Sequence, residues 1–209
     1  MKITVFGANG PTGRQVVTQA LAAGHEVTAF VRDAGTFALA DPRLRVVVGD
    51  TLKDDAKVAD AVRGQDVVVS ALGRRTSFKS ANLIRLSMQS IVSAMERNNV
   101  RRMILVSAFG VGDSKRDAPP LLRIMHRVLL TDIFADKQAA GEDLARSSLD
   151  WIVSYPVILT DGPLTGKYRL GERLELAGMP KISRADVAHF ILANLESREW
   201  VRKVAVISY

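Results

Sequence analysis

Short apolar runs alternate with helix-like segments along the chain, and this alternation limits the fold more than any other feature of the sequence. The runs that predict strands are KITVF (2–6), EVTAFV (26–31), LRVVVGD (44–50), DVVVSAL (66–72), RRMILVSA (101–108), LDWIVSY (149–155) and VRKVAVIS (201–208). Most of them lack polar alternation, which is typical of parallel strands that are buried on both faces.

The segments between these runs predict helices and two long loops. The clearest helical stripe covers 82–98, and another helical stretch, broken near Thr131, ends at about Arg146. SRAD at 183–186 has the spacing of a capping box. Residues 110–120 and 156–171 carry the Gly, Asp and Pro of loops. We therefore predict an α/β fold: a Rossmann-like, doubly wound, mainly parallel sheet with helices on both faces.

Length and composition fit one domain over residues 1–209. The chain is 47% hydrophobic and 24% charged, as is common for globular domains. No apolar run approaches the roughly 20 residues that cross a bilayer, and no targeting signal is recognisable. The chain has no cysteine, which excludes disulfides and thiolate chemistry. We expect a cytoplasmic protein that does not bind membranes.

The net charge of +7 raises the question of nucleic-acid binding. However, the basic residues are scattered through GRRTSFK, ERNNVRR and SREWVRK, with no aromatic stacking platform between them. We expect this charge to attract anionic small molecules instead of nucleic acid. His25, His126 and His189 form no recognisable metal-ligand cluster, so no metal is expected.

Three glycines, Gly7, Gly10 and Gly13, stand between the first predicted strand and the first predicted helix. Backbone N–H groups at such a helix start can hold a pyrophosphate, provided that no side chain covers them. Pro11 suits the first helical turn because its missing N–H costs nothing there. The spacing G-x-x-G-x-x-G is one residue longer than the plain dinucleotide fingerprint. A glycine-lined turn without ligand is the alternative, but the position after the first strand favours a nucleotide.

Arg32 ends the second predicted strand, at the position where NAD-binding proteins carry an acidic residue for the ribose 2′-hydroxyl. An arginine there accommodates a 2′-phosphate through charge-assisted hydrogen bonds. Its neighbour Asp33 leaves open a contact with the ribose, and a solvated surface pair is a further alternative. The arrangement predicts NADP (NADPH) as the cofactor.

The third and fourth predicted strands end in two further groups of candidates. Asp50 and Thr51 would contact the adenine, and Leu72, Gly73 and Arg75 would line the nicotinamide-ribose side. Ordinary turn chemistry explains both groups equally well from the residues alone.

Several segments together resemble the atypical short-chain dehydrogenase/reductases with an NAD(P)-binding domain, and within them the biliverdin and flavin reductases. These segments are VFGANGPTGRQV, FVRD, VVGD, SALGRR, ILVSAFG and LTDGPLTGKY, and the likeness spans nearly the whole chain. The resemblance implies that the NADP site is lined by Gly7, Asn9, Gly10, Thr12, Gly13, Arg32, Asp50, Thr51, Leu72, Gly73 and Arg75.

Typical short-chain reductases use a serine and a Tyr-x-x-x-Lys pair, in which the tyrosine protonates the substrate carbonyl. Ser107 stands at the serine position after the fifth strand, and Lys137 is the candidate lysine, but Ile133 replaces the tyrosine. We assign Ser107 and Lys137 as the catalytic candidates. The alternatives are a serine that caps the strand-end backbone and an exposed helix lysine.

A flavin or quinone-like acceptor suits this incomplete set, because hydride passes to it directly and water can provide the proton. The sequence therefore predicts an NADPH-dependent oxidoreductase, with flavin as a substrate. Its substrate pocket would lie between loops 107–120 and 155–170, lined by Phe109, Tyr155, Pro156, Val157 and Leu159. The resemblance implies a pocket more apolar than that of the biliverdin and flavin reductases, since Val157 and Ile158 remove a polar pocket group. Lys137 stands where those reductases have a pocket histidine.

Two other functions stay open. A non-catalytic NADP(H) sensor would explain the missing tyrosine, whereas a nucleotide-sugar epimerase would need a larger substrate region than the chain has after its sixth strand. The sequence does not distinguish a monomer from a homodimer.

Overall fold

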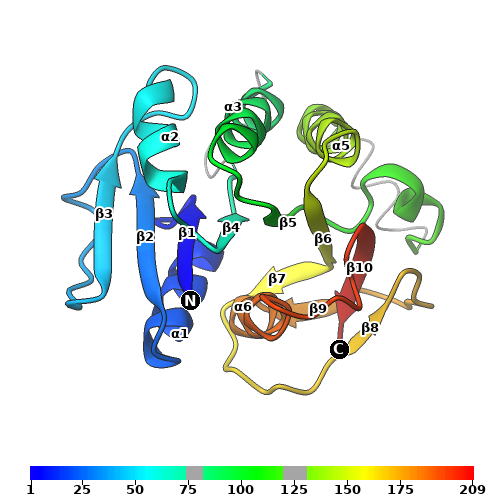
Figure 1. Cartoon of the computed structure of the whole chain (residues 1–209). Helices are drawn as coiled ribbons and strands as arrows, with labels where there is room; N and C mark the ends of the chain where they lie inside the picture. Colours follow the sequence, from blue (N-terminus) through cyan, green and yellow to red (C-terminus); the bar gives the residue numbers. More distant parts are fainter. Residues whose placement is uncertain (74–81, 120–130) are drawn as a thin grey trace.

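An eight-stranded sheet forms the middle of the molecule (Figure 1), in a computed structural model that describes residues 1–73, 82–119 and 131–209. Its strands, in spatial order, are β3 (Leu44–Val48), β2 (Glu26–Val31), β1 (Lys2–Phe6), β4 (Val67–Ser70), β5 (Arg102–Val106), β6 (Asp150–Pro156), β10 (Lys203–Ser208) and β8 (Arg169–Gly171). All neighbours are parallel except β10 and β8. The predicted fold class is confirmed.

Helices cover both faces of the sheet (Figure 1). On one face α1 (Pro11–Ala22) packs against α6 (Arg184–Ala193). On the other face α3 (Leu83–Arg97) packs between α2 (Asp55–Val62) and α5 (Thr131–Ala145). A short 3-10 helix, η1 (Gly112–Arg116), follows β5.

The apolar runs form central strands because both of their faces meet a helix layer. In β1, Ile3 and Val5 belong to the apolar cluster on the α1 and α6 side, whereas Phe6 belongs to the cluster beneath α2 and α3. Thr4 lies between Ile3 and Val5 in the sequence, and its buried hydroxyl donates a hydrogen bond to the Ala61 carbonyl. The strands thus present alternate side chains to two separate cores.

Three short strands were not expected from the sequence. The predicted loop 156–171 contains β7 (Ile158–Thr160) and the edge strand β8, and β7 pairs with β9 (Lys181–Ser183). Strands of three residues are too short to carry a recognisable period of two.

The predicted helix that ends near Arg146 is α5, and its part before Thr131 lies outside the described residues. No helix in the described parts of the chain combines the length and apolar character needed to cross a bilayer.

A buried carboxylate, that of Asp186, ties the segment after β7 to the C-terminal strand. Ser183 caps α6 as its spacing predicted, because its hydroxyl accepts a hydrogen bond from the Asp186 backbone N–H. The reciprocal bond of a capping box is replaced, since the Ser183 N–H donates to the Tyr209 hydroxyl. The Asp186 carboxylate itself accepts hydrogen bonds from Thr165, the Gly166 N–H and the Tyr209 hydroxyl. Burial raises the pKa of Asp186, but these hydrogen bonds outweigh it and lower the pKa to about 2.

We expect Asp186→Asn to lower the free energy of unfolding near neutral pH by about 2 kcal/mol. A carboxyl group with a lowered folded-state pKa stabilises the protein above its ordinary pKa, and this contribution is lost as pH falls from about 4 to 2. Urea unfolding between pH 7 and 2 should therefore show a flatter acid dependence in the variant.

Asp161→Asn is the matched control, because the Asp161 side chain is 85% exposed in its ion pair with Arg184. It should cost less than about 1 kcal/mol. Equal losses in both variants would show that the Asp186 network does not stabilise the fold in this way.

Candidate functional site

The candidate site lies where the strand order reverses, at the carboxyl ends of β1 and β4. The chain leaves β1 through α1 on one face of the sheet, and it leaves β4 toward α3 on the other. Ligands of doubly wound folds bind at such a switch point. The glycine turn follows β1, and the segment 71–73 follows the neighbouring strand β4.

The three glycines have different roles in this turn. Gly7 has φ +75°, and a Cβ there would lie 2.7 Å from the Ala71 carbonyl oxygen. A Cβ on Gly13 would overlap the Gly7 carbonyl, since it would lie 2.8 Å from the carbonyl carbon. A Cβ on Gly10 would meet only the Gly7 oxygen, at 3.2 Å. The fold thus requires Gly7 and Gly13, whereas Gly10 leaves room for a ligand.

The first turn of α1 has the properties of an anion site. Its N-cap residue is Gly10, which provides no side-chain acceptor, and the turn contains no acidic residue. Pro11 is the first helical residue, as predicted, so the first N–H groups that need a partner belong to Thr12 and Gly13. The residues around the turn therefore fit a pyrophosphate group.

The side chains of Arg32 and Asp33, which follow β2, differ in their hydrogen-bond partners. The Asp33 carboxylate accepts a hydrogen bond from the Gly35 N–H at 2.9 Å, so it shapes its own turn. Arg32 is exposed and has no hydrogen-bond or ion-pair partner among the described residues. The cationic group is thus the one that is available to a ligand.

The candidates after β3 form local structure. The Asp50 carboxylate accepts a hydrogen bond from the Leu52 N–H, and the Thr51 hydroxyl lies 2.7 Å from that of Ser87 on α3. Thr51 is buried, so this pair links the turn after β3 to α3.

The candidates after β4 are Leu72, Gly73 and Arg75. Leu72 packs against the cluster beneath α3, and Gly73 is exposed. Arg75 lies outside the described residues.

Ser107 and Lys137 come together after β5. The Lys137 ammonium donates a hydrogen bond to the Ser107 backbone carbonyl at 2.9 Å. The Ser107 side chain is 3% exposed, and its hydroxyl has no partner among the described residues. Ser107 is therefore not a backbone cap, and Lys137 is not merely a solvated helix lysine.

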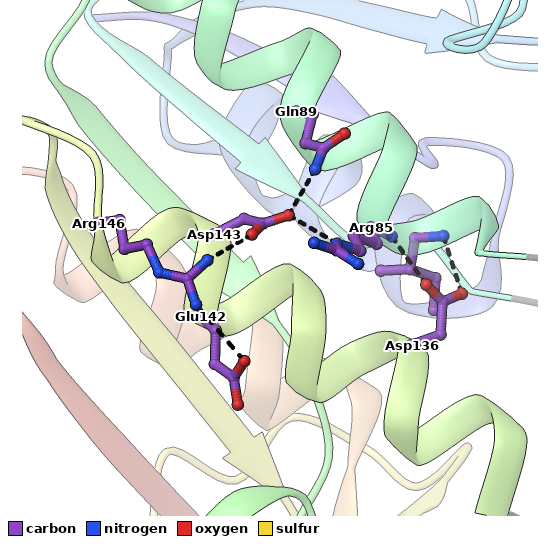
Figure 2. A network of polar contacts seen from close by, with 7 residues as sticks. Arg85, Gln89, Asp136, Glu142, Asp143 and Arg146 are labelled. Carbon is purple, nitrogen blue, oxygen red and sulfur yellow. Dashed lines mark hydrogen bonds and ion pairs between the residues drawn. The ribbon is translucent and has the colours of Figure 1, made fainter.

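Asp136, which sequence reasoning missed, fixes the position of Lys137. Its buried carboxylate accepts hydrogen bonds from the backbone N–H groups of Ile84 and Arg85, at the start of α3 (Figure 2). Further along α5, Asp143 accepts hydrogen bonds from Arg85 and Gln89 (Figure 2). The two helices are joined at both points, so the lysine that follows Asp136 has a defined place.

Burial lowers the pKa of Lys137 to about 8, and the Asp136 carboxylate offsets only part of this effect. The residue as a whole is half-buried, but its ammonium end is the enclosed part. The ammonium is consequently a much stronger acid than that of an ordinary lysine. Ile133 stands one turn earlier in α5, where typical reductases have their tyrosine.

The five predicted pocket residues lie around the end of β6 and the segment after β5. Phe109, Val157 and Leu159 belong to the apolar cluster on the α1 and α6 side, and the Pro156 carbonyl accepts a hydrogen bond from the Phe109 N–H. Phe109 and Val157 are only 3% and 6% exposed, so they mainly support the end of β6. Tyr155 contacts both clusters.

A hollow of about 700 Å³ lies beside Tyr155, between α5, β6 and η1. Its lining includes Gly112, Asp113, Gln138, Glu142, Trp151, Val153, Tyr155 and Arg173. Burial raises the pKa of Tyr155 to about 12, and the carboxylates of Asp113 and Glu142 add to this effect. The phenol therefore remains a hydrogen-bond donor at all ordinary pH values.

Three known proteins resemble this chain in sequence or structure. An uncharacterised chloroplastic protein of Arabidopsis thaliana is 28% identical over 178 residues, which are 79% of this chain and 61% of that protein. The anaerobilin reductase ChuY from Escherichia coli O157:H7 is 27% identical, with a TM-score of 0.82 and coverage of 99% of this chain and 96% of ChuY. A short-chain dehydrogenase/reductase from Veillonella parvula DSM 2008, solved with NADP, is 22% identical, with a TM-score of 0.84 and coverage of 100% and 94%.

The match to the Arabidopsis protein thus spans about three-fifths of that protein's length. The similarity to the Veillonella protein establishes the fold alone. A family model described as NAD(P)H-binding matches residues 7–198, which include the glycine turn, Arg32, Ser107 and Lys137. The expected resemblance to the atypical short-chain dehydrogenase/reductases is confirmed, and the chain belongs to the NAD(P)H-binding family.

Proposed function

We propose that this protein is an NADPH-dependent reductase that passes a hydride to a flavin or quinone-like acceptor. The observation that carries the proposal is the arrangement at the switch point. The uncovered start of α1 lies at the end of β1, and Arg32, which has no partner among the described residues, follows β2. A helix start of this kind fits a pyrophosphate group, and an arginine at this position fits a ribose 2′-phosphate.

The residues after β5 would serve the reacting end of the cofactor. Bound NADPH supplies a hydride from the nicotinamide ring. The Ser107 hydroxyl, which has no partner within the described parts of the chain, would donate a hydrogen bond to the acceptor or to the nicotinamide amide. Lys137, held by the Ser107 carbonyl, would keep a positive charge and an acidic proton beside them. These groups position the reactants and stabilise the negative charge that the acceptor gains.

Two of the similar proteins support this proposal. ChuY is a reductase, and the Veillonella protein was solved with NADP, which agrees with the cofactor proposed from Arg32. Ile133 removes the tyrosine acid that a carbonyl reductase needs, so the proposal favours acceptors that take up hydride without prior protonation.

Steady-state oxidation of NADPH tests the function directly. We expect turnover with FMN, FAD or a soluble quinone, and much slower turnover with simple ketones; anaerobilin belongs in the same panel. If the protein binds NADPH but oxidises it with none of these acceptors, a non-catalytic NADP(H) sensor becomes the better proposal, since Ile133 also suits that function.

Gly10 and Gly13 should separate cofactor binding from folding. We expect Gly10→Ala to weaken NADPH binding about tenfold or more, because the added methyl covers the amides that would hold phosphate. Its free energy of unfolding should fall by no more than about 1 kcal/mol, the cost of alanine at an N-cap. Gly13→Ala should lower that free energy by about 1–3 kcal/mol, because its methyl overlaps the Gly7 carbonyl.

Fluorescence titration with NADPH and thermal unfolding measure both effects. Unchanged NADPH affinity in a folded Gly10→Ala protein would contradict the phosphate site.

Lys137 should determine how the reaction rate depends on pH. With a pKa of about 8, its ammonium form is lost as pH rises through 8, and the rate of acceptor reduction should fall over the same range. Lys137→Met should lower the rate at pH 7 by roughly 10²-fold, because it removes the charge that stabilises the reduced acceptor. Lys137→Arg should keep the positive charge and move the alkaline fall beyond the measured range.

The comparison is made by single-turnover kinetics between pH 6 and 10, under saturating NADPH. An alkaline fall that persists unchanged in Lys137→Met would rule out this role for the lysine.

A further inference from the structure

Arg14 connects the glycine turn to the turn that follows β2. It lies in α1, directly after Gly13, and its guanidinium donates hydrogen bonds to the Asn9 side-chain oxygen and to the Thr36 backbone carbonyl. The guanidinium carbon also lies 5.6 Å from the centre of the Phe37 ring. One side chain therefore contacts two segments whose bonded residues, Asn9 and Thr36, are 27 residues apart in the sequence.

A second link runs parallel to the first. The Asn9 amide donates a hydrogen bond to the Thr36 hydroxyl, while its oxygen accepts from Arg14. Asn9 belongs to the glycine turn, so the amide uses both of its ends to hold this turn against Thr36. The predicted cofactor residue Asn9 thus acts here as part of a connection between two loops.

The turn after β2 is held together by hydrogen bonds among its own residues, so a contact that fixes Thr36 also fixes the rest of the turn. The Asp33 carboxylate accepts a hydrogen bond from the Gly35 N–H, and the Thr36 hydroxyl donates one to the Asp33 carbonyl at 3.2 Å. The Phe37 N–H donates to the Ala34 carbonyl at 3.0 Å. Holding Thr36 in place therefore holds the whole turn, which begins directly after Arg32.

We propose that Arg14 is a positioning residue that determines specificity for the ribose 2′-phosphate: by fixing the turn after β2 against the glycine turn, it sets where the Arg32 guanidinium meets the phosphate. This inference rests on the proposed NADPH site and assigns a second residue to its selectivity. The two arginines have different tasks, because the Arg14 guanidinium is already bonded to Asn9 and Thr36, whereas Arg32 has no partner among the described residues.

The substitution Arg14→Lys distinguishes geometry from charge. Lysine keeps the positive charge but cannot form the paired hydrogen bonds of the planar guanidinium. We expect Arg14→Lys and Arg14→Met to reduce the ratio of NADPH to NADH affinity about tenfold, mainly through weaker NADPH binding. Arg184→Lys is the matched control, because Arg184 lies in the first turn of α6 and binds Asp161. The ratio of NADPH to NADH affinity should not change in this variant.

A double-mutant cycle with Arg32→Ala tests whether Arg14 acts through Arg32. Once Arg32→Ala has removed the phosphate contact, Arg14→Lys should reduce the ratio of NADPH to NADH affinity by less than about twofold. Because the same substitution reduces this ratio about tenfold when Arg32 is present, the two residues would be strongly coupled. Titrations of both cofactors, with melting temperatures of every variant, provide the data. Phe37→Leu removes only the ring beneath the Arg14 guanidinium, so it should reduce the ratio of NADPH to NADH affinity partially. This variant serves as the test if the Arg14 variants do not fold.

Each result decides between named alternatives. An Arg14→Lys protein with the wild-type ratio, equal losses for NADPH and NADH, or additive effects of Arg14 and Arg32 would overturn the positioning role while leaving the NADPH site intact. A wild-type protein that binds both cofactors equally would instead overturn the 2′-phosphate site, and the inference with it.

Discussion

The close approach of α1 to the carboxyl end of β1 is the constraint on which the rest of the site depends. This approach is permitted because Gly13 has no side chain where the Gly7 carbonyl lies, and because Gly7 adopts a positive φ beside Ala71. The start of α1 is thereby brought to the end of the strand, with its amides uncovered at Gly10. A larger residue at Gly13 would push the helix away and remove the anion site along with the packing.

The reacting end of the site is set by a second helix start, that of α3. Asp136 accepts hydrogen bonds from the first amides of α3, and Lys137 follows it in α5, so the same contact orients the lysine. The carboxylate is committed to those amides, which leaves Lys137 without a close ion-pair partner among the described residues. Its ammonium is enclosed but only weakly compensated, and the lowered pKa is the consequence.

The features that local patterns determine were predicted from the sequence. β1 and β2 have the bounds that their apolar runs indicated, and Ser183 caps α6 as its spacing indicated. Side chains whose partners lie far along the chain were not predictable. Arg14 reaches Thr36, and Asp136 reaches the start of α3, and neither contact leaves a periodic signal in the sequence. Tyr155 and Val157, which were expected in one pocket, both contact the cluster on the α1 and α6 side, and Tyr155 also borders the hollow beside α5.

The electrostatics at Lys137 agree with the class of acceptor proposed above. A neutral flavin or quinone that receives a hydride becomes an anion, and an anion beside a buried ammonium stabilises the charged form that burial opposes. The lysine would then be most strongly acidic before reduction and would hold its proton more tightly as charge develops next to it. A ketone gains its full negative charge on one oxygen and needs a nearby proton at once, whereas an extended ring system spreads that charge and tolerates a slower proton from water. The replacement of tyrosine by Ile133 is therefore a smaller loss for an extended acceptor than for a simple carbonyl compound.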